Sequence, residues 1–375
     1  MDEISASRQN ALAGARTMCY IHAQRKVKPM QKLSLTGMLP EEISAQLPET
    51  MQKYRGMQIF RWIHERGAVS FEEMTNLPKS FREEMKDRFA IGAIEQIEVL
   101  SSSDASTDKY LWGLGDGRRI ESVIIRDQNR ITACISSQVG CKFRCSFCRT
   151  GDMGFIRNLT PGEIIDQIIK MKQLLSPNGE NITNIVFMGM GEPLDNLDAV
   201  IRTITILNME TALMIGHRKV TVSTCGIPSG IIRLAETFKK VGLAISLNAP
   251  DDELRNRLIP VNKAYPLKEL MNAARSFAAS SKRRVTFEYA LFEGVNDSPE
   301  HARKLVKLVS SVPSKINLIA FNEYKGCRHK RPSDSKIEAF QRILFEANIT
   351  AMLRKSKGTD ILAACGQLAV GKIKK

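Results

Sequence analysis

The sequence predicts an α/β protein whose main part is a parallel sheet of six βα units, either open or closed as a partial barrel, preceded by a small helical domain and a short antiparallel β extension. Two observations lead to this fold class. From residue 130 onward, short β-branched segments alternate with longer amphipathic segments, which is the pattern of βα units in a parallel sheet. Ahead of residue 130, apolar residues recur first with helical spacing and then with the period of two that strands show.

Changes in composition divide the chain into five segments. Residues 1–40 are polar and basic with little periodicity, and we expect a flexible arm there. Residues 41–95 predict the helical domain, and residues 96–128 predict antiparallel strands with a Gly-Asp-Gly turn at 115–117. The barrel is expected over residues 129–370, followed by a basic tail at 371–375.

Within the barrel, β-branched or apolar segments predict the parallel strands ITACISS, NITNIVFM, KVTVSTC, LAISLN, RRVTFEYAL, KINLIAF and TAMLRK. Helices are expected between them at EIIDQIIKMKQLL, LDAVIRTITILN, SGIIRLAETFKK, LKELMNAARSFAA, PEHARKLVKLVS and SKIEAFQRILFEA. The first helix begins after Thr160, with Pro161 at its first position and Glu163 at its third, the residues preferred at a capped N-terminus. Functional residues in such folds lie at the carboxyl ends of the strands.

The charge of the chain favours an anionic partner. Its formal net charge is +15, and residues 301–375 hold 16 Lys or Arg against 5 Asp or Glu. No apolar run reaches the roughly 18 residues of a membrane span, and the opening residues contain no signal-peptide core. We therefore expect a cytoplasmic protein that binds nucleic acid, with residues 325–331 (KGCRHKR) as a candidate contact; a merely solubilising surface remains the alternative.

Cysteine spacing points to a metal or redox site in a reducing compartment. Eight cysteines are present, and Cys141, Cys145 and Cys148 form a C-x3-C-x2-C motif directly after the first barrel strand. Thiolates are soft ligands for iron or zinc, and a four-iron cluster held by three of them keeps one iron open for another ligand. A zinc site completed by Cys134 is the open alternative.

This motif, placed after the first strand of a βα series, is similar to the signature of the radical-SAM superfamily. Further segments resemble the RlmN/Cfr family of adenine methyltransferases: CISSQVGC, MGMGEP, STCGIP, SLNAP, INLIAFN and AACGQL. The resemblance covers roughly residues 45–370 and implies a helical N-terminal domain followed by a (βα)6 partial barrel. It implies a [4Fe-4S] cluster, two molecules of S-adenosylmethionine (SAM) per turnover, and methylation of an adenine in 23S rRNA and of the tRNA adenine 3′ of the anticodon. It also implies a monomer that takes electrons from a reductant such as flavodoxin.

The resemblance assigns cofactor contacts to residues at strand ends. Cys141, Cys145 and Cys148 would bind the cluster, and SAM would chelate the open iron. The SAM contacts would be Gly191, Glu192, Ser223, Ser246, Leu247, Asn248 and Asn322. Family members usually carry His in place of Asn248 and Pro in place of Glu323.

The resemblance also assigns the catalytic residues. Cys365 would be methylated by one SAM, and a radical derived from a second SAM would take hydrogen from that methyl group. The carbon would then add to the adenine, with Glu121 as proton acceptor. Cys134 would resolve the adduct through a transient disulfide with Cys365.

Two alternatives differ in function. Cfr-type methylation at C8 is the first; the Glu192-Pro193 pair resembles the RlmN branch and favours C2, although TGDMG at 150–154 is slightly Cfr-like. The second is a non-catalytic iron-sulfur or zinc protein that binds RNA, in which Cys134 and Cys365 would have no role.

Overall fold

The computed structural model describes residues 32–48 and 52–370 of the chain. The expected basic tail and the first 31 residues of the expected arm lie outside these ranges. No helix in the described ranges is long and apolar enough to cross a membrane.

The strands are β1 (Leu33–Ser34), β2 (Phe89–Ala90), β3 (Ile94–Ser101), β4 (Thr107–Leu114), β5 (Arg119–Asp127), β6 (Arg130–Cys134), β7 (Gln138–Gly140), β8 (Phe155–Asn158), β9 (Asn184–Phe187), β10 (Val220–Thr224), β11 (Gly242–Ser246), β12 (Val285–Leu291), β13 (Ser314–Ala320) and β14 (Ala351–Arg354). The α-helices are α1 (Pro40–Ala45), α2 (Gln52–His64), α3 (Lys79–Arg88), α4 (Arg149–Asp152), α5 (Pro161–Leu175), α6 (Leu197–Asn208), α7 (Pro228–Thr237), α8 (Asp252–Leu258), α9 (Leu267–Ser281), α10 (Pro299–Val309) and α11 (Asp334–Glu346). Short 3-10 turns are η2 (Phe71–Glu73), η3 (Ser176–Asn178), η4 (Pro193–Asn196), η5 (His217–Lys219) and η6 (Pro260–Lys263).

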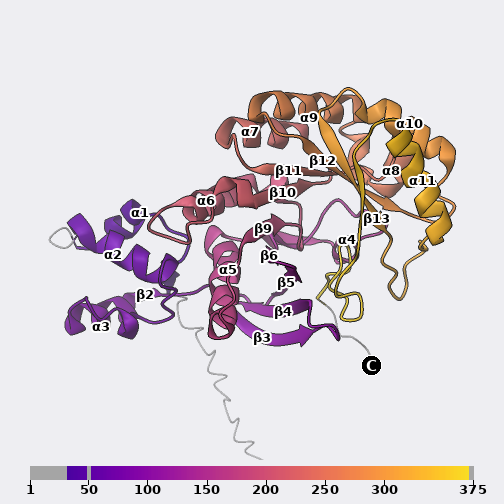
Figure 1. Ribbon diagram of the computed structural model, residues 1–375. Helices are drawn as coiled ribbons and strands as arrows, with labels where there is room; N and C mark the ends of the chain where they lie inside the picture. Colours follow the sequence, from indigo (N-terminus) through magenta and orange to yellow (C-terminus); the bar gives the residue numbers. More distant parts are fainter. Residues whose placement is uncertain (1–31, 49–51, 371–375) are drawn as a thin grey trace, which may run out of the picture. The chain divides into compact units, whose positions relative to one another are not determined.

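One large sheet forms the centre of the fold (Figure 1). In the described part of the chain it has ten strands, in the order β14-β13-β12-β11-β10-β9-β6-β5-β4-β3. Strand β6 and strands β9 to β14 run parallel, and all the expected strands and helices of the partial barrel are present. The α/β partial-barrel fold is therefore confirmed.

The antiparallel strands β3, β4 and β5 belong to this same sheet, whereas the sequence predicts a short sheet of their own. Only two residues separate β5 from β6, and the strands pair in register, with Val123 opposite Cys134. A two-residue connection obliges neighbouring strands to pair as a hairpin. The antiparallel strands are thereby joined to the first parallel strand, and one face of the sheet continues from β4 and β5 to β6.

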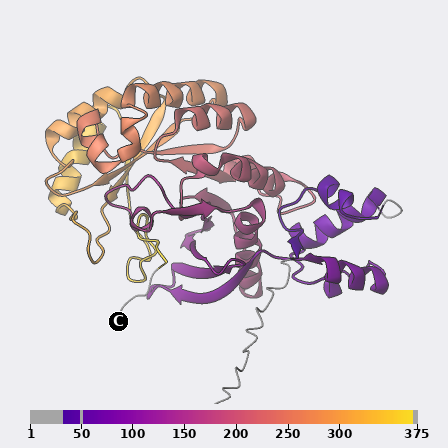
Figure 2. The ribbon, with the colours of Figure 1, turned by 180° about the vertical axis from the view of Figure 1, so that it is seen from behind.

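The two faces of the sheet differ in chemistry. One face is apolar: Phe187, Val222, Ile245, Phe287 and Leu318 are at most 1% exposed. Tyr289 on this face stacks on Phe340 of α11, with ring centroids 5.4 Å apart, and Figures 1 and 2 show α7, α9, α10 and α11 along this side of the sheet. Because side chains alternate along each strand, the pairing register places a different set on the inner face: Lys109, Glu121, Cys134, Ser223, Ser246, Glu288, Asn317 and Arg354.

Residues 32–40 differ from the expected flexible arm. Leu33 pairs with Phe89 in the β1–β2 sheet, and Leu35 is fully buried. The N–H of Gly37 donates to Nε2 of His64 (3.2 Å), which stays neutral because burial lowers the pKa of His64 to about 4. The segment is too short for periodicity to reveal it, and tertiary contacts hold it in place.

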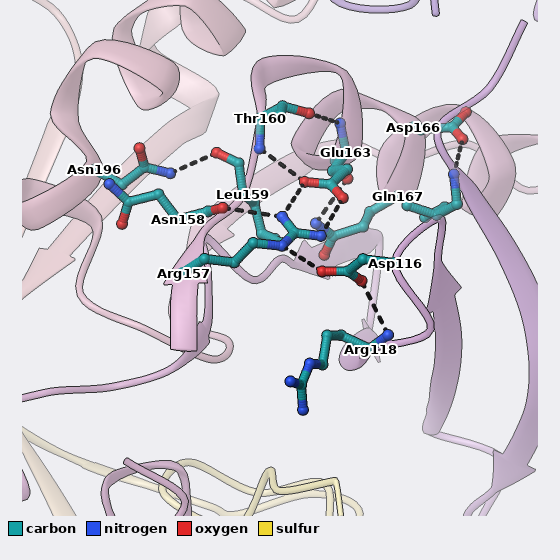
Figure 3. A network of polar contacts seen from close by, with 11 residues as sticks. Asp116, Arg118, Arg157, Asn158, Leu159, Thr160, Glu163, Asp166, Gln167 and Asn196 are labelled. Atoms are coloured by element: carbon teal, nitrogen blue, oxygen red, sulfur yellow. Dashed lines mark hydrogen bonds and ion pairs between the residues drawn. The ribbon is translucent and has the colours of Figure 1, made fainter. Parts of the chain in front are cut away.

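A polar network fixes the start of α5 beside the strand pair β7–β8 (Figure 3). The N–H of Glu163 donates to Oγ1 of Thr160 (3.1 Å), and the N–H of Thr160 donates to the Glu163 carboxylate (2.9 Å), so the predicted cap is confirmed. Arg157 of β8 donates to that carboxylate (2.7 Å) and to Asp116 in the β4–β5 turn (2.7 Å). The network therefore ties the antiparallel strands to the segment that carries the cysteine motif.

Candidate active site

The three cysteines of the C-x3-C-x2-C motif lie on the loop between β7 and α4. The N–H of Cys141 donates to the carbonyl of Gly154 (3.0 Å), and the N–H of Cys148 donates to the carbonyl of Cys145 (3.1 Å). Burial raises the pKa of Cys148 to about 11 and also raises the pKa of Cys141, and the neighbouring Cys145 adds to both shifts. The three thiols thus lie close enough to interact electrostatically.

Residues 364–369, which we call the C-terminal cysteine loop, are attached directly to α4. The N–H of Arg149 donates to the carbonyl of Gly366 (2.9 Å), and the hydroxyl of Thr150 donates to the carbonyl of Leu368 (2.7 Å). The guanidinium of Arg149 also donates to the carbonyl of Gln367 (3.0 Å). Figure 1 shows the yellow C-terminal segment beside α4. Cys365 is thereby held next to the cysteine motif, although more than 200 residues separate them in the sequence.

The same loop contacts Glu121. The N–H of Ala369 donates to Oε2 of Glu121 (3.0 Å), while Nζ of Lys109 lies 3.3 Å from Oε1. Glu121 is 7% exposed and Lys109 is 5% exposed, so the ion pair is buried. Burial raises the pKa of Glu121, and the charge of Lys109 opposes that shift. The carboxylate is therefore positioned in the barrel beside the loop that carries Cys365.

Cys134 and Cys365 are both free thiols and interact electrostatically. Cys134 is buried at the carboxyl end of β6, whereas solvent reaches Cys365. Burial raises the pKa of each thiol, and the positive charge of Arg354 opposes both shifts. Solvent therefore reaches Cys365, although the surrounding protein desolvates its thiol enough to raise the pKa. The expected disulfide between the pair is absent from this state, and its transient formation stays a prediction.

Gly191 and Glu192 follow β9 and lie beside the cysteine motif. Gly191 has a φ of +97°, and a Cβ there would lie 2.5 Å from Cβ of Gln138, so the tight turn requires glycine. The Glu192 carboxylate accepts the N–H groups of Leu194 (3.0 Å) and Cys225 (2.8 Å). Burial raises the pKa of Glu192.

The remaining expected SAM residues lie at or just beyond strand ends. Ser223 and Ser246 are half-buried on the inner face, Leu247 is fully buried, and Asn322 is half-buried after β13. Asn248 has a φ of +54°, and its Oδ1 accepts the N–H of Ala290 (2.7 Å). Asn tolerates such a backbone better than most residues. The hydrogen bond to Ala290 links the end of β11 to β12. The cofactor roles of all these residues stay predictions.

Sequence reasoning missed several inner-face residues. Lys109 follows Asp108 in β4, and Arg354 at the end of β14 is followed by Lys355, so no local pattern distinguishes either residue from a surface charge. Glu288 and Asn317 face each other across β12 and β13, and Nδ2 of Asn317 donates to Oε1 of Glu288 (2.8 Å). For Glu288 a signal was available, because a charged residue within an otherwise apolar strand indicates a buried polar site.

Comparisons with known proteins agree with this geometry. Residues 135–306 match the Radical SAM superfamily, and residues 35–91 match the ribosomal RNA large subunit methyltransferase N-terminal domain. Enzymes of this superfamily use a [4Fe-4S] cluster and SAM.

The cysteine motif fits the cluster. A four-iron cluster takes each thiolate on a different iron, so the thiols need to surround a cube rather than meet at one ion. Over residues 32–48 and 52–370, no three His, Cys, Asp or Glu side chains are placed to hold a metal ion together. Cys134 interacts with Cys365 rather than with the motif, and this placement favours the cluster over zinc completed by Cys134.

Curated relatives and a solved structure cover most of the chain. It is 47% identical over 317 residues to the dual-specificity RNA methyltransferase RlmN of Pelobacter propionicus. This match covers 84% of this chain and 90% of that protein. It is 43% identical over 340 residues to the protein of that name from Geotalea uraniireducens, covering 90% of this chain and 97% of that one. A radical SAM methyltransferase from Sphaerobacter thermophilus superposes with a TM-score of 0.87 at 41% identity, covering 90% and 99% of the two chains. The chain therefore belongs to the RlmN family of radical-SAM enzymes.

Proposed function

We propose that the protein methylates C2 of an adenine in 23S rRNA and of the adenine 3′ of the anticodon in tRNA, through a methylated Cys365. The relatives' names, dual-specificity RNA methyltransferase, support the RNA substrates. The observation that carries the proposal is the attachment of the C-terminal cysteine loop to α4 on one side and to Glu121 on the other. This attachment holds the loop that carries Cys365 against α4, next to the cysteine motif, and against the Glu121 carboxylate.

The ring carbon C2 is not nucleophilic, so direct transfer of a methyl cation from SAM is unfavourable. The cluster and SAM, when bound, supply the radical chemistry that avoids this difficulty. Cys365 carries the carbon on its sulfur, and its exposure allows the base to approach. Glu121 accepts the proton lost from C2, and the charge of the neighbouring Lys109 opposes the rise in the pKa of that carboxylate caused by burial.

Cys134 completes the cycle. Its thiolate attacks the sulfur of Cys365 and a disulfide forms, while the transferred carbon leaves with the electron pair of its bond to sulfur and takes up a proton to become the methyl group on the base. The positive charge of Arg354 favours the thiolate form, although burial leaves the pKa of both cysteines raised. A dithiol reductant then returns the pair to two thiols, as expected for a catalytic disulfide in a reducing cytoplasm.

We also propose that the basic loop at residues 325–331 contacts RNA phosphates. Lys325, Arg328 and Lys330 in it are exposed. The ring of His329 hydrogen-bonds through Nε2 to the hydroxyl of Ser146 in the cysteine motif (2.9 Å). RNA bound by this loop would therefore lie beside the cluster. The protein acts as a monomer and receives electrons from a flavodoxin-like reductant.

Mass spectrometry of rRNA and tRNA digests tests the proposal. A deletion strain should lack 2-methyladenosine in both RNAs, and the wild-type gene should restore it while a Cys365→Ala gene should not. Restoration of 8-methyladenosine instead would support the Cfr-type alternative. Identical digests from all strains would refute methylation of RNA.

A further inference from the structure

Two buried oxygen atoms on the inner face of the sheet lack a hydrogen-bond donor. Glu288 of β12 and Asn317 of β13 lie opposite each other, and each residue is 7% exposed. Nδ2 of Asn317 donates to Oε1 of Glu288 (2.8 Å). The other two oxygens, Oε2 of Glu288 and Oδ1 of Asn317, accept no hydrogen bond from any described residue. Buried polar atoms in native proteins nearly always have a partner, so this oxygen pair indicates a ligand that donates hydrogen bonds.

The neighbours of Glu288 in the sequence fix the direction of its side chain. Phe287 is fully buried, and Tyr289 stacks on Phe340 of α11, so both point to the helical side of the sheet. Because side chains alternate along a strand, Glu288 points to the opposite, inner face, beside Ser246 of β11. The oxygen pair therefore lies inside the partial barrel.

The C-terminal cysteine loop reaches the same part of the barrel. Nε2 of Gln367 in this loop donates to the carbonyl of Glu323, which follows β13 (3.1 Å), while the end of the loop contacts β5. The loop thus connects the two walls of the barrel. The negative charge of Glu288 also contributes to the raised pKa of Cys365. A ligand on the oxygen pair would therefore lie in the space that the proposed carbon carrier faces.

The amino group of an adenine matches the oxygen pair. It carries two N–H donors, so one hydrogen bond can be donated to each oxygen. Carboxylate and amide side chains are established partners of base amino groups in protein–nucleic acid contacts. A purine with a carbonyl oxygen at the same ring position would instead place an acceptor against two acceptors. Two molecules could bring such an amino group here, the target base and SAM.

We propose that Glu288 and Asn317 bind the amino group of an adenine ring. The inference rests on the proposed function, methylation of adenine at C2. Each of the two residues is the central residue of its strand, whereas the expected SAM contacts lie at or beyond strand ends. This placement favours the target base as the source of the amino group, and the contact then selects adenine over other purines.

The test uses three tRNAs that differ only in the base 3′ of the anticodon, which is adenine, purine or hypoxanthine. All three bases keep a C–H group at C2, so the reacting carbon is present in each. In single turnover, wild-type protein should methylate the adenine tRNA at least roughly 10-fold faster than the purine tRNA, because purine leaves both buried oxygens unpaired. This comparison needs no variant and so does not depend on the folding of one.

Two variants locate the contact. Glu288→Gln introduces an amide that can donate to a carbonyl oxygen, so the rate on hypoxanthine relative to adenine should rise by roughly 10-fold. Asn317→Ala removes one acceptor, so the ratio of the adenine and purine rates should fall. Asp166→Asn of α5 is the matched control, since Asp166 is 3% exposed and its carboxylate accepts the N–H groups of Ala93 (2.8 Å) and Ile94 (3.1 Å) at the start of β3. Its rate ratios should equal those of wild type.

Equilibrium dialysis of SAM without RNA separates the two sources of the amino group. Altered base ratios with unchanged SAM affinity would assign the contact to the target base, and weakened SAM affinity with unchanged base ratios would assign it to SAM. Thermal denaturation shows whether each variant is folded. Unchanged base ratios and unchanged SAM affinity in both folded variants would overturn the inference. A wild-type protein that methylates none of the three tRNAs, nor 23S rRNA, would instead refute the proposed function.

Discussion

Replacing Gly366 with alanine is expected to displace Cys365 without unfolding the protein. Gly366 has a φ of +81°, and an added Cβ would lie 3.1 Å from the carbonyl oxygen of Phe147, a backbone atom next to Cys148. The left-handed backbone costs a residue with a side chain about 1–2 kcal/mol. The loss of unfolded-state entropy returns about 0.4–1 kcal/mol, so the free energy of unfolding should fall by roughly 1 kcal/mol from strain.

The close contact adds a displacement to this strain, because the C-terminal cysteine loop must move away from Phe147 by a few tenths of an ångström or more. Misplacing a reacting group by about 1 Å can reduce a rate roughly 100-fold. We therefore expect a large fall in the single-turnover rate of methyl transfer, with RNA affinity unchanged.

Gly179→Ala is the matched control for this prediction. Gly179 has a φ of +72°, and a Cβ added there would meet nothing within 4 Å, so it shares the strain but not the contact. Thermal unfolding and single-turnover assays on both variants separate the two effects. A Gly366→Ala protein that reacts as fast as Gly179→Ala would refute the inference that Cys365 depends on this loop geometry.

Three further predictions follow from the polar contacts. Lys109→Met should raise the pKa of Glu121 further, so the acidic limb of the pH–rate profile should move to higher pH and the rate should recover in alkali; an unmoved limb would exclude Glu121 as the proton acceptor. The same variant should lose stability as pH rises, since a carboxyl with a raised pKa in the folded state binds its proton more tightly there than when unfolded. Arg157→Ala should lower the free energy of unfolding by about 2–3 kcal/mol, because the nearly buried Glu163 loses its cation; urea denaturation measures this, and a change below roughly 0.5 kcal/mol would contradict it. Neutralising the charges at residues 325–331 should weaken RNA binding and flatten its dependence on salt; an unchanged slope would mean that the loop is only a solvated surface.

Local patterns were sufficient for most of the fold. The alternation of strand and helix segments predicts every parallel strand of the sheet, and the cap at Thr160 is where the sequence places it. Local sequence patterns failed to predict structure that depends on contacts between residues far apart in the chain. Residues 32–40 are held by β2 and His64, and nothing within that short segment indicates those partners.

The residues of the candidate site also fall into those that a local pattern predicts and those that depend on contacts between distant residues. The spacing of the three cysteines is a local signal, so the loop that we expect to bind the cluster was visible in the sequence. Glu121 by itself reads as an exposed strand residue, and only the resemblance singles it out; its burial arises from Lys109 across the strand pair and from Ala369, which lies 248 residues further along the chain.

The most direct test of the central claim, that Cys365 carries the transferred carbon and Cys134 releases it, is a denaturing gel of proteins purified with cellular RNA. Cys134→Ala should accumulate a covalent protein–RNA adduct, because the resolving thiol is missing. Cys365→Ala and the double variant should form neither adduct nor methylated product, since no carbon is carried. A Cys134→Ala protein that turns over without an adduct, or a Cys365→Ala protein that still methylates RNA, would contradict the claim.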